Sequence, residues 1–211
     1  MSFVDVVYLG GTSIDFIQRP SRSENITFDI HIGGGITNSA IISSKLGQKV
    51  AILSKVGKDL LGDWAIQELK RFKVRVDGVI QDPQIKTSIA IAHIDSKGNS
   101  RYVFYKDEIK SLIVTLKEVK NKNLLNRCKI FHFGSSFSYH KETYKEILNY
   151  IEYLKGLDIF ISFDPNIRPY TIKDKQTAKE RVLNLLNLVD MAKISQADLL
   201  FLTGEKHPKK G

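Results

Sequence analysis

Cysteine is nearly absent from this 211-residue sequence, in which Cys128 is the only one. A single cysteine can form neither an intrachain disulfide nor a thiolate metal site, so a reducing compartment is the expected environment. Long hydrophobic runs are absent as well, because no apolar stretch approaches the roughly 20 residues that span a bilayer. The sequence therefore predicts a cytoplasmic protein with no membrane segment.

Patterns typical of metal or nucleic-acid binding are also missing. The five histidines have no metal-ligand spacing, and His132, inside the apolar run 130–133, is expected to be a core residue. The sequence has 32 basic and 23 acidic residues, and its net charge of +9 suits a partner that carries phosphate. The basic residues follow helical stretches without interleaved aromatics, so we interpret them as solvated helix faces. We expect no nucleic-acid partner, and this function ranks third among those considered.

A hydrophobic content of 42% over 211 residues is sufficient for one compact domain with a core. Short β-rich runs alternate with amphipathic segments, a pattern that predicts repeated β-α units around a mainly parallel sheet. The expected strands are Val4–Leu9, Val50–Val56, Lys129–Phe133, Asp158–Phe163 and Asp190–Ile194. Helices with one apolar face are expected after an N-cap at Asp59 and again between Tyr144 and Leu154.

Two stretches interrupt this alternation, at residues 16–32 and 87–105. The second has the pattern of a β-hairpin whose turn contains Gly98. Neither stretch contains a crossover helix. We therefore expect their strands to form a small separate sheet beside the α/β body.

Polar or glycine-rich loops follow all five expected strands, and they begin at Gly10, Gly57, Gly134, Asp164 and Ser195. Ligands of open α/β sheets bind beyond the carboxyl ends of the strands. Each loop taken singly is also explained by ordinary turn chemistry, which favours the same residue types. Five such loops on one rim favour a shared ligand crevice.

The segment from Gly33 to Gly62 has the most informative spacing. Three successive glycines allow close backbone approach, Thr37 can cap the helix that follows, and Asn38 brings an amide to its entrance. On these residues alone, a glycine turn with a polar cap is the better explanation. The glycines match neither the Walker pattern nor the G-x-G-x-x-G dinucleotide fingerprint.

The longer spacing resembles the first signature of the ribokinase-type (PfkB) carbohydrate kinases, through Gly33, Gly34, Asn38, Ala40, Gly47, Gly57, Asp59 and Gly62. The resemblance extends over essentially the whole chain. Residues 164–168 are similar to the Asp-Pro-Asn-x-Arg segment of the fructokinase and 2-keto-3-deoxygluconate kinase branches. It implies a ribokinase-like α/β fold in one incomplete domain over residues 1–211, a mainly parallel sheet flanked by helices. Residues 16–32 and 87–105 would be its small β lid.

The resemblance implies an ATP- and magnesium-dependent kinase that phosphorylates a hydroxyl of a monosaccharide or sugar acid, with a homodimer contact through the lid. The substrate-binding residues it implies are Asp15, Gly33, Gly34, Asn38, Asp164, Asn166 and Arg168. Lys193, Ser195 and Asp198 fall where the family has an Asn-x-x-Glu motif near the magnesium and the phosphates. Cofactor binding is implied for these three residues, and a metal role for Asp198.

No Gly-Ala-Gly-Asp segment occurs in the sequence, although in this family that segment holds the transferred phosphate and supplies the catalytic base. We therefore assign no catalytic residue and expect a C-terminally truncated family member that is inactive alone. The alternative is a non-catalytic sugar-binding module that retains Asp15, Asn38 and Arg168.

Overall fold

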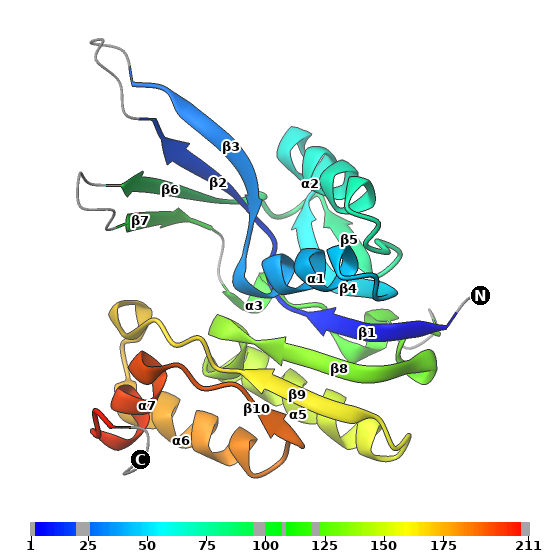
Figure 1. Ribbon diagram of the computed structural model, residues 1–211, viewed down its shortest axis with the longest axis vertical. Coiled ribbons are helices and arrows are strands. Elements are labelled where there is room, and N and C mark those ends of the chain that lie inside the picture. The colour runs from blue at the N-terminus through cyan, green and yellow to red at the C-terminus, as the bar shows by residue number, and fades with distance from the viewer. Residues whose placement is uncertain (1–2, 20–25, 95–99, 107–108, 120–122, 208–211) are drawn as a thin grey trace.

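The computed structural model of the chain describes residues 3–19, 26–94, 100–106, 109–119 and 123–207 (Figure 1). Its body is a six-stranded, fully parallel sheet with the strand order β10-β9-β8-β1-β4-β5. The strands are β1 (Val4–Leu9), β4 (Val50–Gly57), β5 (Val79–Asp82), β8 (Cys128–Gly134), β9 (Phe160–Asp164) and β10 (Met191–Ala192). The mainly parallel sheet expected from the sequence is confirmed.

Helices cover the two faces of this sheet. They are α1 (Gly35–Lys45), α2 (Leu60–Arg71), α3 (Ile109–Leu112), α4 (Leu116–Val119), α5 (Lys141–Lys155), α6 (Lys175–Leu186) and α7 (Gln196–Thr203). Short 3₁₀ turns are η2 (Leu125–Arg127), η3 (Ser135–Ser138) and η4 (Pro169–Thr171). Among the described residues, no helix is both long and apolar enough to cross a bilayer.

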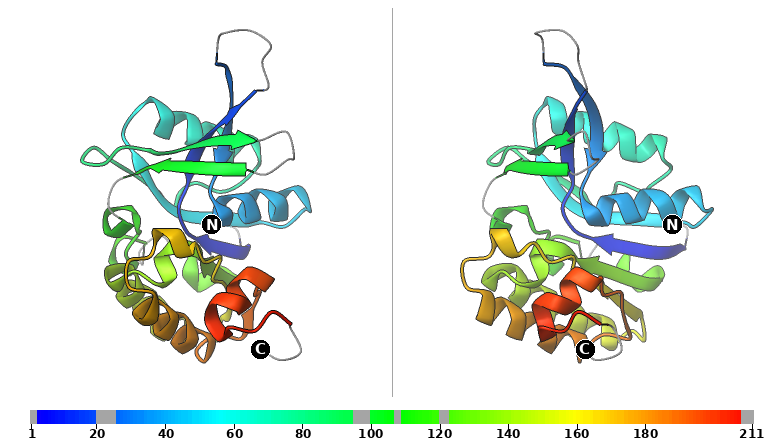
Figure 2. Two further views of the ribbon diagram at one scale, coloured as in Figure 1. Left: turned by 90° about the vertical axis from the view of Figure 1, so that its left-hand side faces the viewer. Right: turned by 60° about the vertical axis from the view of Figure 1, so that its left-hand side comes forward.

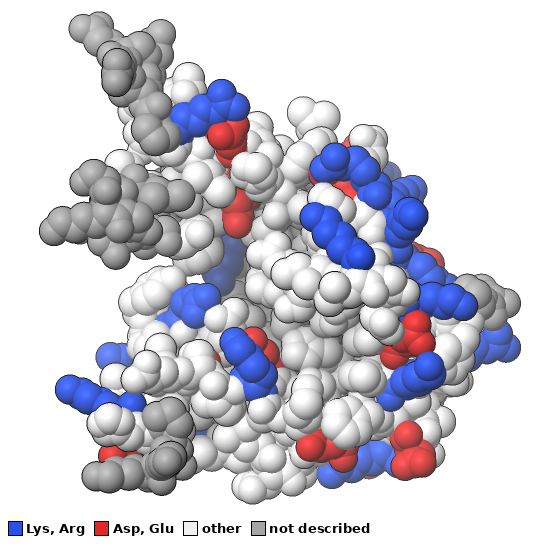
Figure 3. Space-filling model, in the orientation of Figure 1, with Lys and Arg blue, Asp and Glu red and all other residues white. Residues whose placement is uncertain are grey.

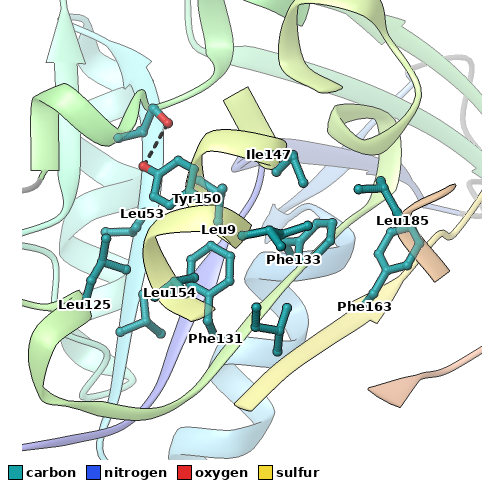
Figure 4. Packing of buried hydrophobic residues seen from close by; sticks show 14 of the residues in the cluster. Leu9, Leu53, Leu125, Phe131, Phe133, Ile147, Tyr150, Leu154, Phe163 and Leu185 are labelled. Atoms are coloured by element: carbon teal, nitrogen blue, oxygen red, sulfur yellow. Dashed lines mark hydrogen bonds between the residues drawn. The ribbon is translucent and has the colours of Figure 1, made fainter. Parts of the chain in front are cut away.

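The main core lies between the sheet and the helices α5 and α6, and Figure 4 shows its aromatic centre. Phe133 of β8 stacks on Phe163 of β9 at 4.7 Å between ring centroids, and Phe131 stacks on Tyr150 of α5 at 5.4 Å. The Tyr150 hydroxyl, which is buried, donates a hydrogen bond to the carbonyl oxygen of Val114 at 3.0 Å. Because a buried hydroxyl needs such a partner, this bond fixes α5 against the loop before α4.

A second core lies between the opposite face of the sheet and the helices α1 and α2. At its edge, His132 of β8 packs edge-on against Tyr8, and its Nδ1 lies 3.0 Å from the Ser162 hydroxyl. Burial lowers the pKa of His132, which favours the neutral ring. The expected structural role of this histidine is confirmed.

Four strands form the separate sheet expected from the two irregular stretches. They are β2 (Ser13–Gln18), β3 (Phe28–Gly33), β6 (Ser88–Ile94) and β7 (Ser100–Tyr105), in the order β3-β2-β6-β7. We call this sheet the lid. Figure 2 shows it extending from the body, with the C-terminal end of the chain at the opposite end of the molecule. The first lid strand begins at Ser13, before the expected start at residue 16, and Gly98 lies outside the described residues.

Several expected boundaries and caps differ in the structure. Asp158 adopts a left-handed turn conformation with φ of 55°, so β9 begins only at Phe160, and β10 is shorter than expected. Asp59 caps α2, as predicted, by accepting a hydrogen bond from the Gly62 amide at 2.8 Å. Thr37 does not cap α1, because the helix starts at Gly35 and places Thr37 inside its first turn.

Candidate functional site

A cavity of about 280 Å³ lies between the lid and the carboxyl ends of β1, β8 and β9. Its walls come from the β1–β2 turn, the start of α1, the lid strands β2, β6 and β7, the helix α3, the turn η3 with Tyr139 directly after it, and the loop of residues 166–171. Three of the five predicted rim loops therefore meet at one cavity. The loops at Gly57 and Ser195 are not among its described walls.

Asp15 reaches the cavity from the lid strand β2, and its carboxylate accepts a hydrogen bond from the Ser13 hydroxyl at 2.9 Å. Burial raises the pKa of Asp15, although the Ser13 hydrogen bond acts in the opposite direction. On the neighbouring strand, a Cβ atom at Gly33 would collide with the Asp15 carboxylate. Glycine at this position therefore makes room for the acidic side chain.

The start of α1 forms the opposite wall. Gly34 has a φ of 104°, and a Cβ atom there would collide with the Gly11 carbonyl oxygen. The Thr37 hydroxyl donates to that same oxygen at 3.0 Å, and it lies 3.0 Å from the Thr12 hydroxyl. These contacts fix the first turn of α1, from which the exposed Asn38 lines the cavity.

The loop after β9 brings two more predicted residues to the cavity, Asn166 and Arg168. Asn166 has a left-handed φ of 40°, and its backbone amide donates a hydrogen bond to the Asp164 carboxylate at 3.1 Å. Asp164 itself does not line the cavity; its other oxygen lies 3.3 Å from the Lys193 ammonium group. Asp164 thus shapes the loop that carries Asn166 and Arg168.

Ser195 and Asp198 form a capping box at the start of α7, in which each side chain receives a hydrogen bond from the other's backbone. One Asp198 oxygen accepts from the Ser195 amide at 3.1 Å and hydroxyl at 2.5 Å, and the other accepts from the Ile167 amide at 2.7 Å. Only 2% of Asp198 is exposed. A carboxylate with both oxygens occupied by protein donors does not fit a magnesium ligand.

Within the described part of the chain, no group of three or more histidine, cysteine, aspartate or glutamate side chains is placed to hold a metal ion. The described residues alone therefore do not form a magnesium site. ATP contacts from Lys193 and Ser195 stay predictions. The structure gives Lys193 an exposed ion pair with Asp164 and gives Ser195 a capping role.

Sequence reasoning missed the wall that β7 contributes. Tyr102, Phe104 and Lys106 all line the cavity; the two rings stack at 5.9 Å, and the Lys106 ammonium lies 5.7 Å from the Phe104 ring centre. The Lys106 side chain keeps exposed surface, yet the surrounding protein desolvates its amine enough to lower the pKa. The period of two along a strand, which puts these residues on one face, was the available signal.

Tyr139 is the second residue that was missed. It lines the cavity, it is only 2% exposed, and its buried hydroxyl has no hydrogen-bond partner among the described residues. Burial raises the pKa of this phenol, although the nearby Thr171 side chain and Arg168 backbone act in the opposite direction without making a hydrogen bond of full geometry, so the hydroxyl stays neutral. An unsatisfied buried hydroxyl beside a cavity is a polar group suited to a ligand. No local sequence pattern distinguishes Tyr139 from a core tyrosine.

Solved sugar kinases have the same fold. The structure matches a fructokinase from Xylella fastidiosa with bound ATP at a TM-score of 0.84 and 22% identity, over 95% of this chain and 60% of that one. It matches an uncharacterised sugar kinase from Pyrococcus horikoshii, in complex with ATP, at a TM-score of 0.82 and 25% identity, over 94% and 66%. The fold is therefore that of the ribokinase-like sugar kinases.

Sequence comparison identifies the family. The model of the pfkB family carbohydrate kinases matches residues 4–210, and the chain belongs to this family. A probable fructokinase-7 from Arabidopsis thaliana is 29% identical over 206 residues, which are 96% of this chain and 60% of that protein. The chain thus spans less than two thirds of the length of such relatives.

Proposed function

We propose that the chain is a PfkB-family sugar kinase that binds a monosaccharide or sugar acid, and that the family's reaction transfers a phosphoryl group from ATP to a hydroxyl of this substrate. The main support is that Asp15, Asn38, Asn166 and Arg168, far apart in the sequence, line one cavity. The family's Gly-Ala-Gly-Asp segment does not occur in the 211 residues. We therefore propose that this chain is inactive alone.

The cavity walls suit a polyol. The Asp15 carboxylate accepts hydrogen bonds from sugar hydroxyls, and the amides of Asn38 and Asn166 both donate and accept. The paired rings of Tyr102 and Phe104 offer an apolar surface to the carbon face of a sugar. Phosphoryl transfer depends mainly on positioning and charge stabilisation, so a site that fixes the nucleophilic hydroxyl supplies the first of these requirements.

The charge of the cavity favours a sugar acid over a neutral sugar. Asp15 is the only acidic side chain among its described walls, whereas Lys106 and Arg168 are both cationic. The Arg168 guanidinium donates only to the neighbouring Ile167 carbonyl, at 3.3 Å, within the described residues. A planar guanidinium can bind a carboxylate through two parallel hydrogen bonds. The relatives named fructokinase are the argument for the neutral alternative.

Calorimetric titration without nucleotide tests sugar binding, with a panel that pairs neutral ketoses and aldoses with aldonic and 2-keto-3-deoxy acids. We expect saturable binding that Asp15→Ala abolishes. Asp29→Ala is the matched control, because Asp29 lies on the adjacent lid strand and pairs with Arg19. Absence of binding to every sugar would refute the function, and equal loss in both variants would refute the role of Asp15.

A non-catalytic sugar-binding module is the second candidate, favoured by the missing catalytic segment. Fusion to the C-terminal third of a relative distinguishes the two. Sugar phosphorylation by a folded fusion supports the kinase, whereas sugar binding without phosphorylation supports the module.

We also propose that the outer face of the lid forms a homodimer contact. A row of apolar side chains crosses all four lid strands in register, through Ile30, Phe16, Ile91 and Val103. Ile30 and Val103 are 49% and 56% exposed, respectively. An apolar row of this length is typical of a face that a partner covers.

Binding to nucleic acid has weaker support. On the face shown in Figure 3, acidic side chains lie among the basic ones, so the positive charge does not form one continuous track. Salt-dependent binding to duplex or single-stranded nucleic acid is the outcome that would support this third function.

A further inference from the structure

We propose that Asp198 is a positioning residue of the sugar site, which holds the loop of residues 164–168 in its binding conformation. This proposal rests on the sugar-binding function proposed above. Its basis is the contact between Asp198 and the Ile167 amide, which lies between the two cavity residues Asn166 and Arg168.

The contact is buried and charge-assisted. The Ile167 amide donates to one Asp198 oxygen at 2.7 Å, and Asp198 and Ile167 are 2% and 4% exposed. The Ile167 side chain belongs to the main core. Residue 167 is therefore fixed twice, through its amide by Asp198 and through its side chain by the core. A hydrogen bond to a charged acceptor is stronger than one between neutral groups.

The loop needs this support because its backbone is strained. Asn166 has a φ of 40°, a conformation that costs a non-glycine residue free energy unless its surroundings enforce it. Two carboxylates hold successive amides of the loop: Asp164 accepts from the Asn166 amide at 3.1 Å, and Asp198 accepts from the Ile167 amide. Without Asp198, the Ile167 amide would be buried without a hydrogen-bond acceptor, which costs free energy. The loop would rearrange to give this amide a new partner, and the rearrangement would turn Arg168 away from the cavity.

The capping box provides the matched control. Ser195 donates to the second Asp198 oxygen, and among the described residues the hydrogen bonds of its side chain stay within the cap of α7. Ser195→Ala therefore weakens the cap of α7 and leaves the Ile167 contact in place. Asp198→Ala removes both, and Asp198→Asn keeps the side-chain volume but leaves only one acceptor oxygen for donors on two sides.

Hydrogen exchange of the wild-type chain and of these variants, without sugar, measures the loop directly. In Asp198→Ala or Asp198→Asn we expect backbone amides of the loop to exchange at least about tenfold faster, because in both variants the Ile167 amide loses its hydrogen bond to a charged carboxylate. Ser195→Ala should affect only the start of α7. Circular dichroism shows which of the two Asp198 variants is folded, and the comparison with Ser195→Ala is made with that folded variant.

Sugar titration then measures the consequence for binding. In titrations without nucleotide, where the predicted ATP contact of Ser195 does not enter, we expect about tenfold weaker sugar binding in the Asp198 variant and wild-type sugar affinity in Ser195→Ala. If Asp198 acts through Arg168, its effect should disappear in an Arg168→Ala background, whereas a purely structural effect would add to it.

The outcomes separate the two proposals. Absence of sugar binding by the wild-type chain would overturn the proposed function and the positioning role together. Sugar binding with unchanged loop exchange in the Asp198 variant, or with equal losses of affinity in Asp198 and Ser195 variants, would overturn the positioning role alone.

Discussion

Asp59→Ala is expected to destabilise the fold more than any helix cap alone would explain. The Asp59 carboxylate caps α2 at Gly62, and it also accepts hydrogen bonds from the Thr87 amide at 2.9 Å and hydroxyl at 2.7 Å. The Thr87 hydroxyl in turn accepts from the Gly57 amide at 3.0 Å. One carboxylate thus joins the end of β4, the start of α2 and the residue before lid strand β6.

The expected loss is about 3 kcal/mol in the free energy of unfolding. A helix cap contributes about 1 kcal/mol, and a buried amide left without its charged acceptor costs about 2 kcal/mol more. Asp63→Ala is the control, because Asp63 also carries a negative charge in the first turn of α2 but is exposed, and within the described residues its side chain accepts a hydrogen bond only from Gln81. It should cost at most about 0.5 kcal/mol.

Urea denaturation at several pH values tests both the size and the origin of the effect. Burial opposes the charged form of Asp59, but the hydrogen bonds from Thr87 and Gly62 outweigh it and lower the pKa. A carboxyl with a lower pKa in the folded state contributes stability above its unfolded pKa and loses it as the pH falls through the folded value. The wild-type advantage should therefore shrink in acid. A loss no larger than that of Asp63→Ala, or one independent of pH, would refute this reasoning.

Two further predictions concern the glycine junction and the lid surface. Gly34→Ala should destabilise the fold by more than about 2 kcal/mol, because it places a side chain at a positive φ and makes its Cβ collide with the Gly11 carbonyl oxygen. Gly47→Ala, where φ is 89° and the space is open, should cost only about 1 kcal/mol. Equal melting temperatures of the two variants would contradict this prediction. Val103→Lys on the outer lid face should convert a dimer to a monomer, as measured by the molar mass in light scattering. Ile42→Lys, at an equally exposed position of α1, should leave the molar mass unchanged. An unchanged molar mass for Val103→Lys would count against the lid contact.

Local patterns were sufficient for most of the body of the fold. The apolar runs predicted the central strands β1, β4 and β8 closely, because each is buried in the middle of a parallel sheet. They were less accurate at the edge, where the strand expected at Asp190–Ile194 is reduced to β10, which pairs with β9 through only two residues. There the chain is held by the Asp190 side chain, which accepts a hydrogen bond from the Ile161 amide at 2.7 Å. The spacing of apolar residues in the sequence cannot predict such a contact.

The candidate site was predictable where a residue's neighbours in sequence define its role. Asn38 and Arg168 fall in spacings specific enough to locate them at the cavity. Asp198 is the opposite case. The order Ser195-x-x-Asp198 has the pattern of a capping box, but its contact with Ile167, a residue 31 positions away, depends on tertiary packing.

Asp164 was expected at the substrate and instead shapes the backbone around Asn166, again through a contact that only the folded loop creates.

The lid joins the body through four chain crossings, and residues at all four line the cavity, namely Ser13, Gly34, Ser88 and Lys106. Any change in the angle between lid and body must therefore change distances within the cavity itself. The residues at which a lid motion would have to bend the chain are also residues of the pocket, so any such motion would be thermodynamically linked to occupancy of the cavity. A substitution at a crossing would alter both the intrinsic dissociation constant and the population of the competent lid angle, and the measured dissociation constant is the first divided by the second.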